Sequence, residues 1–229
     1  MRLFSSFSGG KESCLALWRA IQGGHRVEYL LTMLNTTGAR TRGHGLRREL
    51  LEAQAEALGM VLLAGRASWR GYEAAFKRAM ALLRKKGVEG GVFGDLWLEE
   101  HREWVERVCS EVGMEALLPL WGKAPEEVLE EFLTEGFFAV IVSLKEGMPK
   151  RWLGRALDAS FLEEARALGI DPCGERGEYH TLVLDGPVFR RRLEILEARP
   201  MRHRGMFSLE ILDFTLRDKD GRLPHNLRP

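Results

Sequence analysis

A Ser-Gly-Gly-Lys sequence close to the start of the chain holds the first residues suited to chemistry. It follows a short apolar stretch typical of a strand and precedes a segment typical of a helix. A strand, a glycine turn and a helix present backbone N–H groups and the positive end of the helix dipole to an anion, and paired glycines let the backbone approach a phosphate. We therefore predict a phosphate-binding loop, for which an ordinary glycine turn is the alternative. Its predicted contacts are Ser8, Gly9, Gly10, Lys11 and Ser13.

The loop is not a Walker A loop, which has a longer spacer before its Gly-Lys pair and a Ser or Thr directly after the lysine. Here Glu12 follows Lys11. The order Ser-Gly-Gly-Lys-Glu-Ser resembles the Ser-Gly-Gly-x-Asp-Ser loop of the ATP pyrophosphatases (adenine nucleotide alpha hydrolases), which cleave ATP to AMP and pyrophosphate. Glu12 stands where that family usually has Asp. The resemblance implies that ATP is the ligand of this loop.

Asp95 is a second candidate, because it directly follows a predicted strand over residues 88–93 and Gly94. A carboxylate at the carboxyl end of a strand is well placed to hold Mg2+ or a phosphate-bound water, and a helix cap is the alternative. His101 and Arg102 come one to two helical turns later and could face the same cleft. This position predicts a metal and phosphate site beside the loop.

The loop over residues 35–45 is polar and basic, and it follows a second predicted strand over residues 27–34. His44 lies between two glycines there and has little packing to do. It could contact substrate or phosphate, and an ordinary exposed histidine is the alternative. We also assign Met33, near the end of the strand, to the nucleotide site.

The densest chemistry lies in residues 171–181, which carry several carboxylates, a thiol, an imidazole and a hydroxyl. Glu175 and Glu178 could bind an amine or a metal, and His180 could move protons near neutral pH. Cys173 would act as a covalent nucleophile only with a nearby base to lower its pKa.

Alternating strands and helices must position these residues. After the first strand, strands are predicted at 27–34, 60–64, 88–93 and 114–117, with helices at 46–58, 71–86 and 99–112. This order predicts an α/β fold with a doubly wound, parallel, five-stranded sheet, Rossmann-like (HUP) in class. Ligands bind at the carboxyl ends of the strands in such sheets, where the Ser8 loop, the 35–45 loop and Asp95 all fall.

The regular alternation of strands and helices ends near Trp121. A helix from Pro125, a strand at 137–144, a helix at 160–168 and strands near 181–184, 192–199 and 206–217 predict a smaller α+β domain. We therefore expect domains over residues 1–120 and 121–229, with residues 218–229 frayed.

Composition narrows the class of protein. The 229 residues carry a net charge of +1, so the chain is no polycation suited to holding nucleic acid by charge. Its three cysteines lie far apart without Cys-x-x-Cys spacing, which favours a reduced, intracellular protein and disfavours structural zinc. With no signal peptide and no apolar run near the roughly 20 residues of a membrane helix, we expect a cytoplasmic protein that binds neither membrane nor DNA.

Further motifs resemble the diphthine–ammonia ligase family, and the matches span residues 8–189. The Gly-Glu-x-Gly-Glu-Tyr-His-Thr segment is far more specific than the loop. The motifs are Ser-Gly-Gly-Lys-Glu-Ser, Gly94-Asp95, His101-Arg102, Pro119-Leu120-Trp121-Gly122, Leu153-Gly154-Arg155, Cys173-Gly174-Glu175-x-Gly177-Glu178-Tyr179-His180-Thr181 and Asp185-Gly186-Pro187.

The resemblance implies amidation, in which diphthine on elongation factor 2, ATP and ammonium give diphthamide, AMP and pyrophosphate. With Mg2+, this assigns catalysis to Lys11, Asp95 (also the metal residue), Glu175, Glu178 and His180. Nucleotide binding falls to Ser8, Gly9, Gly10, Lys11, Ser13, Met33 and His44, and substrate binding to His101, Arg102, Cys173, Gly174, Tyr179 and Thr181. A homodimer is a further expectation.

Three alternatives stay open. The carboxylate could differ from diphthine, because diphthamide is a feature of archaeal and eukaryotic elongation factors. A tRNA-modifying ATP pyrophosphatase would use the same loop to activate a base carbonyl. A nucleotide sensor that binds ATP or AMP without turnover is favoured only by Glu12 in place of Asp.

Overall fold

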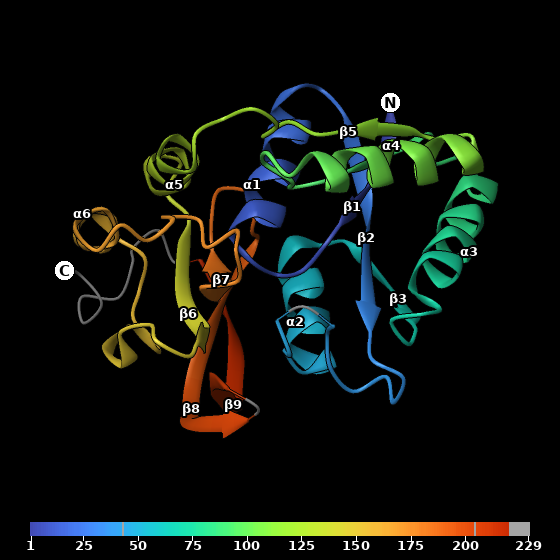
Figure 1. Ribbon diagram of the computed structural model, residues 1–229. Helices are drawn as coiled ribbons and strands as arrows, with labels where there is room; N and C mark the ends of the chain where they lie inside the picture. The colour runs from blue at the N-terminus through green and yellow to red at the C-terminus, as the bar shows by residue number, and fades with distance from the viewer. Residues whose placement is uncertain (43, 204, 220–229) are drawn as a thin grey trace. The chain divides into compact units, whose positions relative to one another are not determined.

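The structure is a computed structural model that describes residues 1–42, 44–203 and 205–219 (Figure 1). The chain divides into two compact units. The first comprises Met1–Glu56 and Met60–Ala124, and the second comprises Ala57–Gly59 and the chain from Pro125 on. The sequence predicted a boundary after residue 120.

The first unit is built on a parallel sheet in the order β3-β2-β1-β4-β5. Runs of buried residues in β1 and β2 fit a sheet covered on both faces. The predicted α/β fold with a doubly wound, five-stranded sheet is therefore confirmed. The strands are β1 (Arg2–Ser6), β2 (Arg26–Leu34), β3 (Val61–Arg66), β4 (Gly90–Val92) and β5 (Glu115–Leu117).

Helices cover both faces of this sheet, α1 and α2 on one and α3 and α4 on the other (Figure 1). Helix α3 buries Ala75, Phe76, Ala79, Met80 and Leu83, the stripe expected of an amphipathic helix. Helix α4 ends at a left-handed glycine, as many helices do. The helices are α1 (Lys11–Gln22), α2 (Arg48–Leu58), α3 (Tyr72–Lys85) and α4 (Glu99–Val112).

An aromatic cluster joins α3 to the middle of the sheet. Phe4 of β1 lies edge-on to Phe76 and Phe93, with ring centroids 6.4 and 5.9 Å away. All three side chains are at most 2% exposed, so this contact anchors the strand that leads into the glycine loop. The carboxyl end of β1 is thereby held rigidly.

The second unit contains an antiparallel sheet in the order β7-β6-β9-β8, with helices beside it. This confirms the predicted α+β class. β8 is longer than predicted and continues through Pro200, which an edge strand tolerates because its missing N–H can face outward. The elements are α5 (Pro125–Thr134), β6 (Phe138–Lys145), η1 (Lys150–Trp152), α6 (Ala159–Ala167), β7 (Tyr179–Asp185), β8 (Arg191–His203) and β9 (Met206–Asp218).

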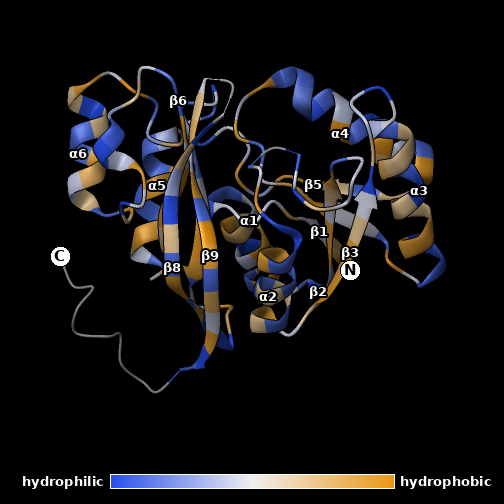
Figure 2. Ribbon diagram, turned by 90° about the horizontal axis from the view of Figure 1, so that it is seen from below, coloured by the Kyte–Doolittle hydropathy of each residue, from blue (hydrophilic) through white to orange (hydrophobic). Residues whose placement is uncertain are grey.

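The helices carry both hydrophobic and hydrophilic residues (Figure 2). Within residues 1–42, 44–203 and 205–219, no helix has the length and apolar character needed to cross a membrane. From residue 220 on, the predicted frayed tail lies outside the described residues.

Candidate functional site

The glycine loop joins β1 to α1 and folds on its own hydroxyl groups. Ser8 Oγ accepts a hydrogen bond from the Gly10 N–H at 3.3 Å, and Ser13 Oγ donates to the Gly10 carbonyl at 2.9 Å. Gly10 is the N-cap of α1, and no side chain caps this helix end. A helix N-terminus that directly follows a glycine turn suits an anion such as a phosphate.

A buried glutamine of α2 holds the loop from behind. Gln54 is 0% exposed, and its Nε2 donates to the Gly9 carbonyl at 3.0 Å. Gly9 has φ +81°, and a Cβ added there would lie 2.4 Å from Gln54 Oε1. The sequence-based site did not include Gln54, although a glutamine among the apolar positions of a helix was a usable signal.

Lys11, the predicted positive charge of the loop, is buried. Its side chain is 3% exposed, and its Nζ lies 2.6 Å from Glu12 Oε1. The Glu12 side chain is 17% exposed. The positive charge of the loop therefore already has a carboxylate partner, and Glu12 is the residue that supplies it.

Asp95 lies beside the first turn of α1. A Cβ added at Gly94 would lie 2.9 Å from the Glu12 backbone, so the carboxyl end of β4 packs directly against the loop. Asp95 Oδ1 and His101 Nδ1 are 3.1 Å apart, with side chains 25% and 58% exposed. The structure therefore brings Asp95 and His101 together, and their roles in metal and substrate binding stay predictions.

The donor set near Asp95 fits a Mg2+ ion that arrives with a nucleotide. In the described part of the chain, no group of three or more His, Cys, Asp or Glu side chains is arranged to hold a metal ion. Mg2+ in nucleotide sites usually needs only one or two protein carboxylates, because phosphates and water complete its shell. A single partly exposed Asp95 meets this requirement.

The other predicted residues of this unit have different surroundings. Met33 is 6% exposed and belongs to the core beneath α3 and α4, while its carbonyl accepts the Arg42 N–H at 3.1 Å. His44 is half-buried in the loop after β2. Arg102 donates from Nε to Glu106 at 2.8 Å, and its guanidinium lies 5.3 Å from the centroid of Trp121. Arg102 thus pairs with α4 and the chain after β5.

In the second unit, the predicted segment is held by buried side chains. The Tyr179 hydroxyl donates to the Pro172 carbonyl, and its ring is 5.3 Å from that of Phe161. Cys173 Sγ donates to the Pro125 carbonyl at 3.2 Å. Tyr179, Cys173, Gly174 and Thr181 are all buried, so they set the shape of the segment, and substrate contact by them stays a prediction.

Glu175, Glu178 and His180 keep part of their surface exposed. Glu178 Oε2 accepts the Arg176 N–H at 3.0 Å, and the Glu178 carbonyl accepts the Lys145 N–H at 2.9 Å. The Glu178 carboxylate is therefore positioned by a backbone N–H, and both glutamates are partly exposed.

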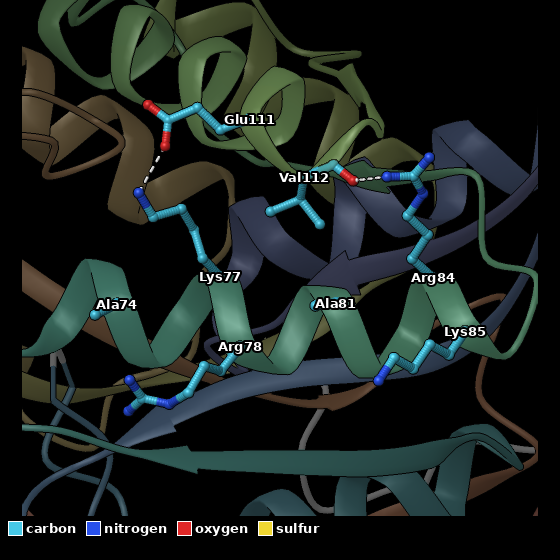
Figure 3. A pocket seen from close by; sticks show the side chains of 8 residues that line it. All are labelled: Ala74, Lys77, Arg78, Ala81, Arg84, Lys85, Glu111 and Val112. Carbon is cyan, nitrogen blue, oxygen red and sulfur yellow. Dashed lines mark hydrogen bonds and ion pairs between the residues drawn. The ribbon is translucent and has the colours of Figure 1, made fainter.

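A groove between α3 and α4 is separate from these residues (Figure 3). Lys77 pairs with Glu111 across it at 2.6 Å, and Arg84 donates to the Val112 carbonyl. Both helices run back toward the amino ends of the strands, whereas ligands of such sheets bind at the carboxyl ends. The groove is lined by Ala74, Lys77, Arg78, Ala81, Arg84, Lys85, Glu111 and Val112.

Comparison with known proteins gives matches along most of the chain. A diphthine–ammonia ligase of Bos taurus is 27% identical over 259 residues, covering 100% of this chain and 97% of its own. The Homo sapiens diphthine–ammonia ligase is 27% identical, with the same coverage. A Schizosaccharomyces pombe diphthine–ammonia ligase is 25% identical, covering 89% of this chain and 37% of its own.

Among solved structures, a predicted subunit of a tRNA methyltransferase from Methanocaldococcus jannaschii is 16% identical, with a TM-score of 0.46 over 81% of this chain and 97% of that one. Family comparison is more specific. The diphthamide synthase N-terminal domain matches residues 1–116, and the diphthamide synthase C-terminal domain matches residues 124–212. Because these two matches take in both sheets and the motif-bearing segments, the chain belongs to the diphthamide synthase family.

Proposed function

We propose that this protein is an ATP-dependent ligase that adenylates a carboxylate and transfers it to ammonia, releasing AMP and pyrophosphate. Its proposed substrate is diphthine on elongation factor 2. The observation that carries the proposal is the match of residues 1–116 and 124–212 to the two domains of one synthase family. Neither a tRNA-modifying enzyme nor a nucleotide sensor has a comparable observation in its favour.

The carboxylate must be activated before it reacts with ammonia, because oxide, its only leaving group, is a very poor one. In the first step a carboxylate oxygen attacks the α-phosphorus of ATP, and the bond to pyrophosphate breaks. In the second step the ammonia nitrogen attacks the carbonyl carbon of the mixed anhydride, AMP leaves, and nitrogen loses a proton. Negative charge therefore develops first on the departing pyrophosphate and later on AMP.

The glycine loop would bind the phosphates through the N-terminal end of α1. A helix terminus contributes about 0.3–1 kcal/mol when exposed and up to about 2 when partly buried. Enzymes lower barriers by at least about 8 kcal/mol, so further positive charge is needed. Lys11 would contribute part of it, and Asp95 would hold Mg2+, which neutralises charge developing on phosphate oxygens.

The Cys173–Thr181 segment would handle the second substrate. Glu175 and Glu178 are proposed to bind ammonium, because both residues are partly exposed and a backbone N–H fixes the Glu178 carboxylate. His180 is proposed to take up a proton as the amide forms, since imidazole titrates near neutral pH. His101, paired with Asp95, is proposed to contact the acyl substrate.

The proposal is tested by AMP release from ATP and Mg2+ with diphthine-bearing elongation factor 2, with and without ammonium. Lys11→Ala should abolish AMP formation, whereas Lys85→Ala, an exposed lysine on α3, should leave it unchanged. Glu178→Ala should keep ATP affinity and lose the amide product. Tight ATP binding by the wild type without AMP release would overturn the ligase, and lost ATP binding in Glu178→Ala would overturn that residue's role.

A further inference from the structure

Arg42 is held in place at the carboxyl end of β2, although the predicted site did not include it. Its backbone N–H donates to the Met33 carbonyl at 3.1 Å. The preceding residue, Thr41, pairs with Leu34 as an isolated antiparallel bridge, and its N–H donates to the Leu46 carbonyl at 2.8 Å. The loop is thus built on its own hydrogen bonds, and it presents Arg42 at the edge where ligands of this fold bind.

Two contacts from the chain after β3 orient the Arg42 side chain. Its Cζ lies 4.1 Å from the centroid of the Trp69 ring, and its Nη1 donates to the Ala67 carbonyl at 2.9 Å. Trp69 is 71% exposed, so its ring is not part of the core. A stacked guanidinium with one fixed hydrogen bond has a defined plane, which lowers the entropy lost when it binds a planar anion.

Most donors of this guanidinium have no acceptor. Across residues 1–42, 44–203 and 205–219, the Ala67 carbonyl is the side chain's acceptor, and no carboxylate pairs with Arg42. Its Nε is enclosed and has no hydrogen-bond partner. Arg107 differs, because it donates to Glu73 and Glu111. The guanidinium of this half-buried arginine therefore keeps Nη hydrogens that an anion could accept without displacing a carboxylate partner.

Arg42 and Asp95 both act electrostatically on the same residue, Tyr72. Burial raises the pKa of Tyr72, the nearby Asp95 carboxylate raises it further, and the Arg42 guanidinium opposes this. The Tyr72 hydroxyl is therefore within electrostatic reach of both side chains. Tyr72 also contacts Trp69, with ring centroids 6.2 Å apart. These residues form one cluster on the carboxyl edge of the first unit.

We propose that Arg42 binds the carboxylate of the acyl substrate and positions it for activation. The inference rests on the proposed ligase function, and it assigns the carboxylate-binding residue of that reaction. A carboxylate would accept hydrogen bonds from the outer edge of the guanidinium, from Nη2 and the second Nη1 hydrogen, in the two-pronged geometry that arginine favours. Trp69 is a positioning residue in this arrangement, because it fixes the guanidinium plane.

The first experiment uses the wild-type protein and needs no known substrate. Enclosure should slow the exchange of the Arg42 Nε–H with water, so its signal is accessible in a 1H–15N spectrum, assigned by its loss in Arg42→Lys. Butyrate should shift this signal saturably, and the uncharged isostere butyramide should not. Equal shifts with both probes, no shift with butyrate, or binding of inorganic phosphate in place of butyrate would overturn the carboxylate assignment.

The second experiment compares Arg42→Met and Arg42→Lys with Arg78→Met, an exposed arginine of α3. Arg42→Met should weaken binding of diphthine-bearing elongation factor 2 by about 10- to 100-fold, the usual range for a hydrogen bond to a charged group, and keep ATP affinity. Arg42→Lys should lose less affinity for the modified elongation factor than Arg42→Met, and Arg78→Met should lose none. Lost ATP affinity with unchanged protein binding would overturn the inference. Wild type that shifts with butyrate but makes no AMP would refute the ligase alone.

Discussion

Substituting Gly9 by alanine tests whether the glycine loop is held in place by α2. The substitution places a Cβ at φ +81°, a conformation that costs an L-residue about 1–2 kcal/mol. The new Cβ would also lie 2.4 Å from Gln54 Oε1 and 3.1 Å from Leu51 Cδ1. Moving Gln54 breaks the buried hydrogen bond to the Gly9 carbonyl, worth about 1–3 kcal/mol when a buried group loses its partner. We expect Gly9→Ala to destabilise the first unit by about 2–5 kcal/mol.

Gly24→Ala is the matched control, because Gly24 has the same φ of +81° and no neighbouring atom within 4 Å of an added Cβ. It should cost only the backbone term of about 1–2 kcal/mol. In a Gln54→Ala background, Gly9→Ala should fall to this smaller cost, because only the flexible end of Leu51 remains in the way. Urea unfolding can be monitored by hydrogen exchange of peptides from residues 1–56, which measures the stability of the first unit separately.

The same variants separate stability from ligand binding. Gly9→Ala should weaken ATP binding because the loop N–H groups move, and Gly24→Ala should not, since Gly24 follows the far end of α1. Equal costs for the two substitutions, or an unchanged cost for Gly9→Ala in the Gln54→Ala background, would refute the claim that close contact with Gln54 fixes the loop.

The cysteines should be unreactive in the folded protein, because Cys14, Cys109 and Cys173 are all buried and burial raises the pKa of Cys109 to about 12. A thiol reagent at pH 7.5 should label none of them until guanidinium is added, and rapid labelling of one would contradict this packing. Glu73→Gln should lower Tm at pH 7 more than at pH 2–3. Hydrogen bonds from Arg107 first, and from other neighbours, hold the pKa of Glu73 well below its usual range. The stability that the ionised Glu73 carboxylate contributes is fully present above its pKa in the unfolded chain, and it is lost as pH falls toward its lower pKa in the folded protein. A Tm difference between Glu73→Gln and the wild type that does not depend on pH would contradict the assignment.

The fold of the first unit was predictable because its signals are local. Each strand is a run of apolar residues, each helix has an apolar stripe, and glycines such as Gly113 mark where helices end. The long hairpin of β8 and β9 was harder, because its strand content depends on pairing with each other over 13 residues and less on local pattern. Pro200 in particular indicates a strand end in the sequence, and only the edge position in the sheet makes it acceptable.

Neighbouring candidate residues could be named from the sequence where they are close along the chain, and contacts were missed where they depend on packing. Asp95 and His101 were expected to face one cleft, and their side chains lie 3.1 Å apart because a carboxylate after β4 and the first turn of α4 are close along the chain. Gln54 contacts Gly9 only because α2 packs behind the loop, 45 residues away in sequence. Arg42 stacks on Trp69 only because β2 and β3 are neighbours in the sheet. No spacing in the sequence indicates these contacts.

The pairing of Lys11 with Glu12 reduces the positive charge that the glycine loop can offer a nucleotide. Glu12 offsets part of the Lys11 charge, and Asp95 follows Gly94, which packs against the same turn of α1. A triphosphate would therefore meet the helix terminus, which contributes at most about 2 kcal/mol, and only part of the Lys11 charge. In the proposed reaction, a divalent cation must then supply most of the positive charge at the phosphates. In the proposed reaction, Asp95 would bring the metal to the nucleotide, and Glu12, one methylene longer than the usual aspartate, is the carboxylate partner of the buried Lys11, 2.6 Å from its Nζ.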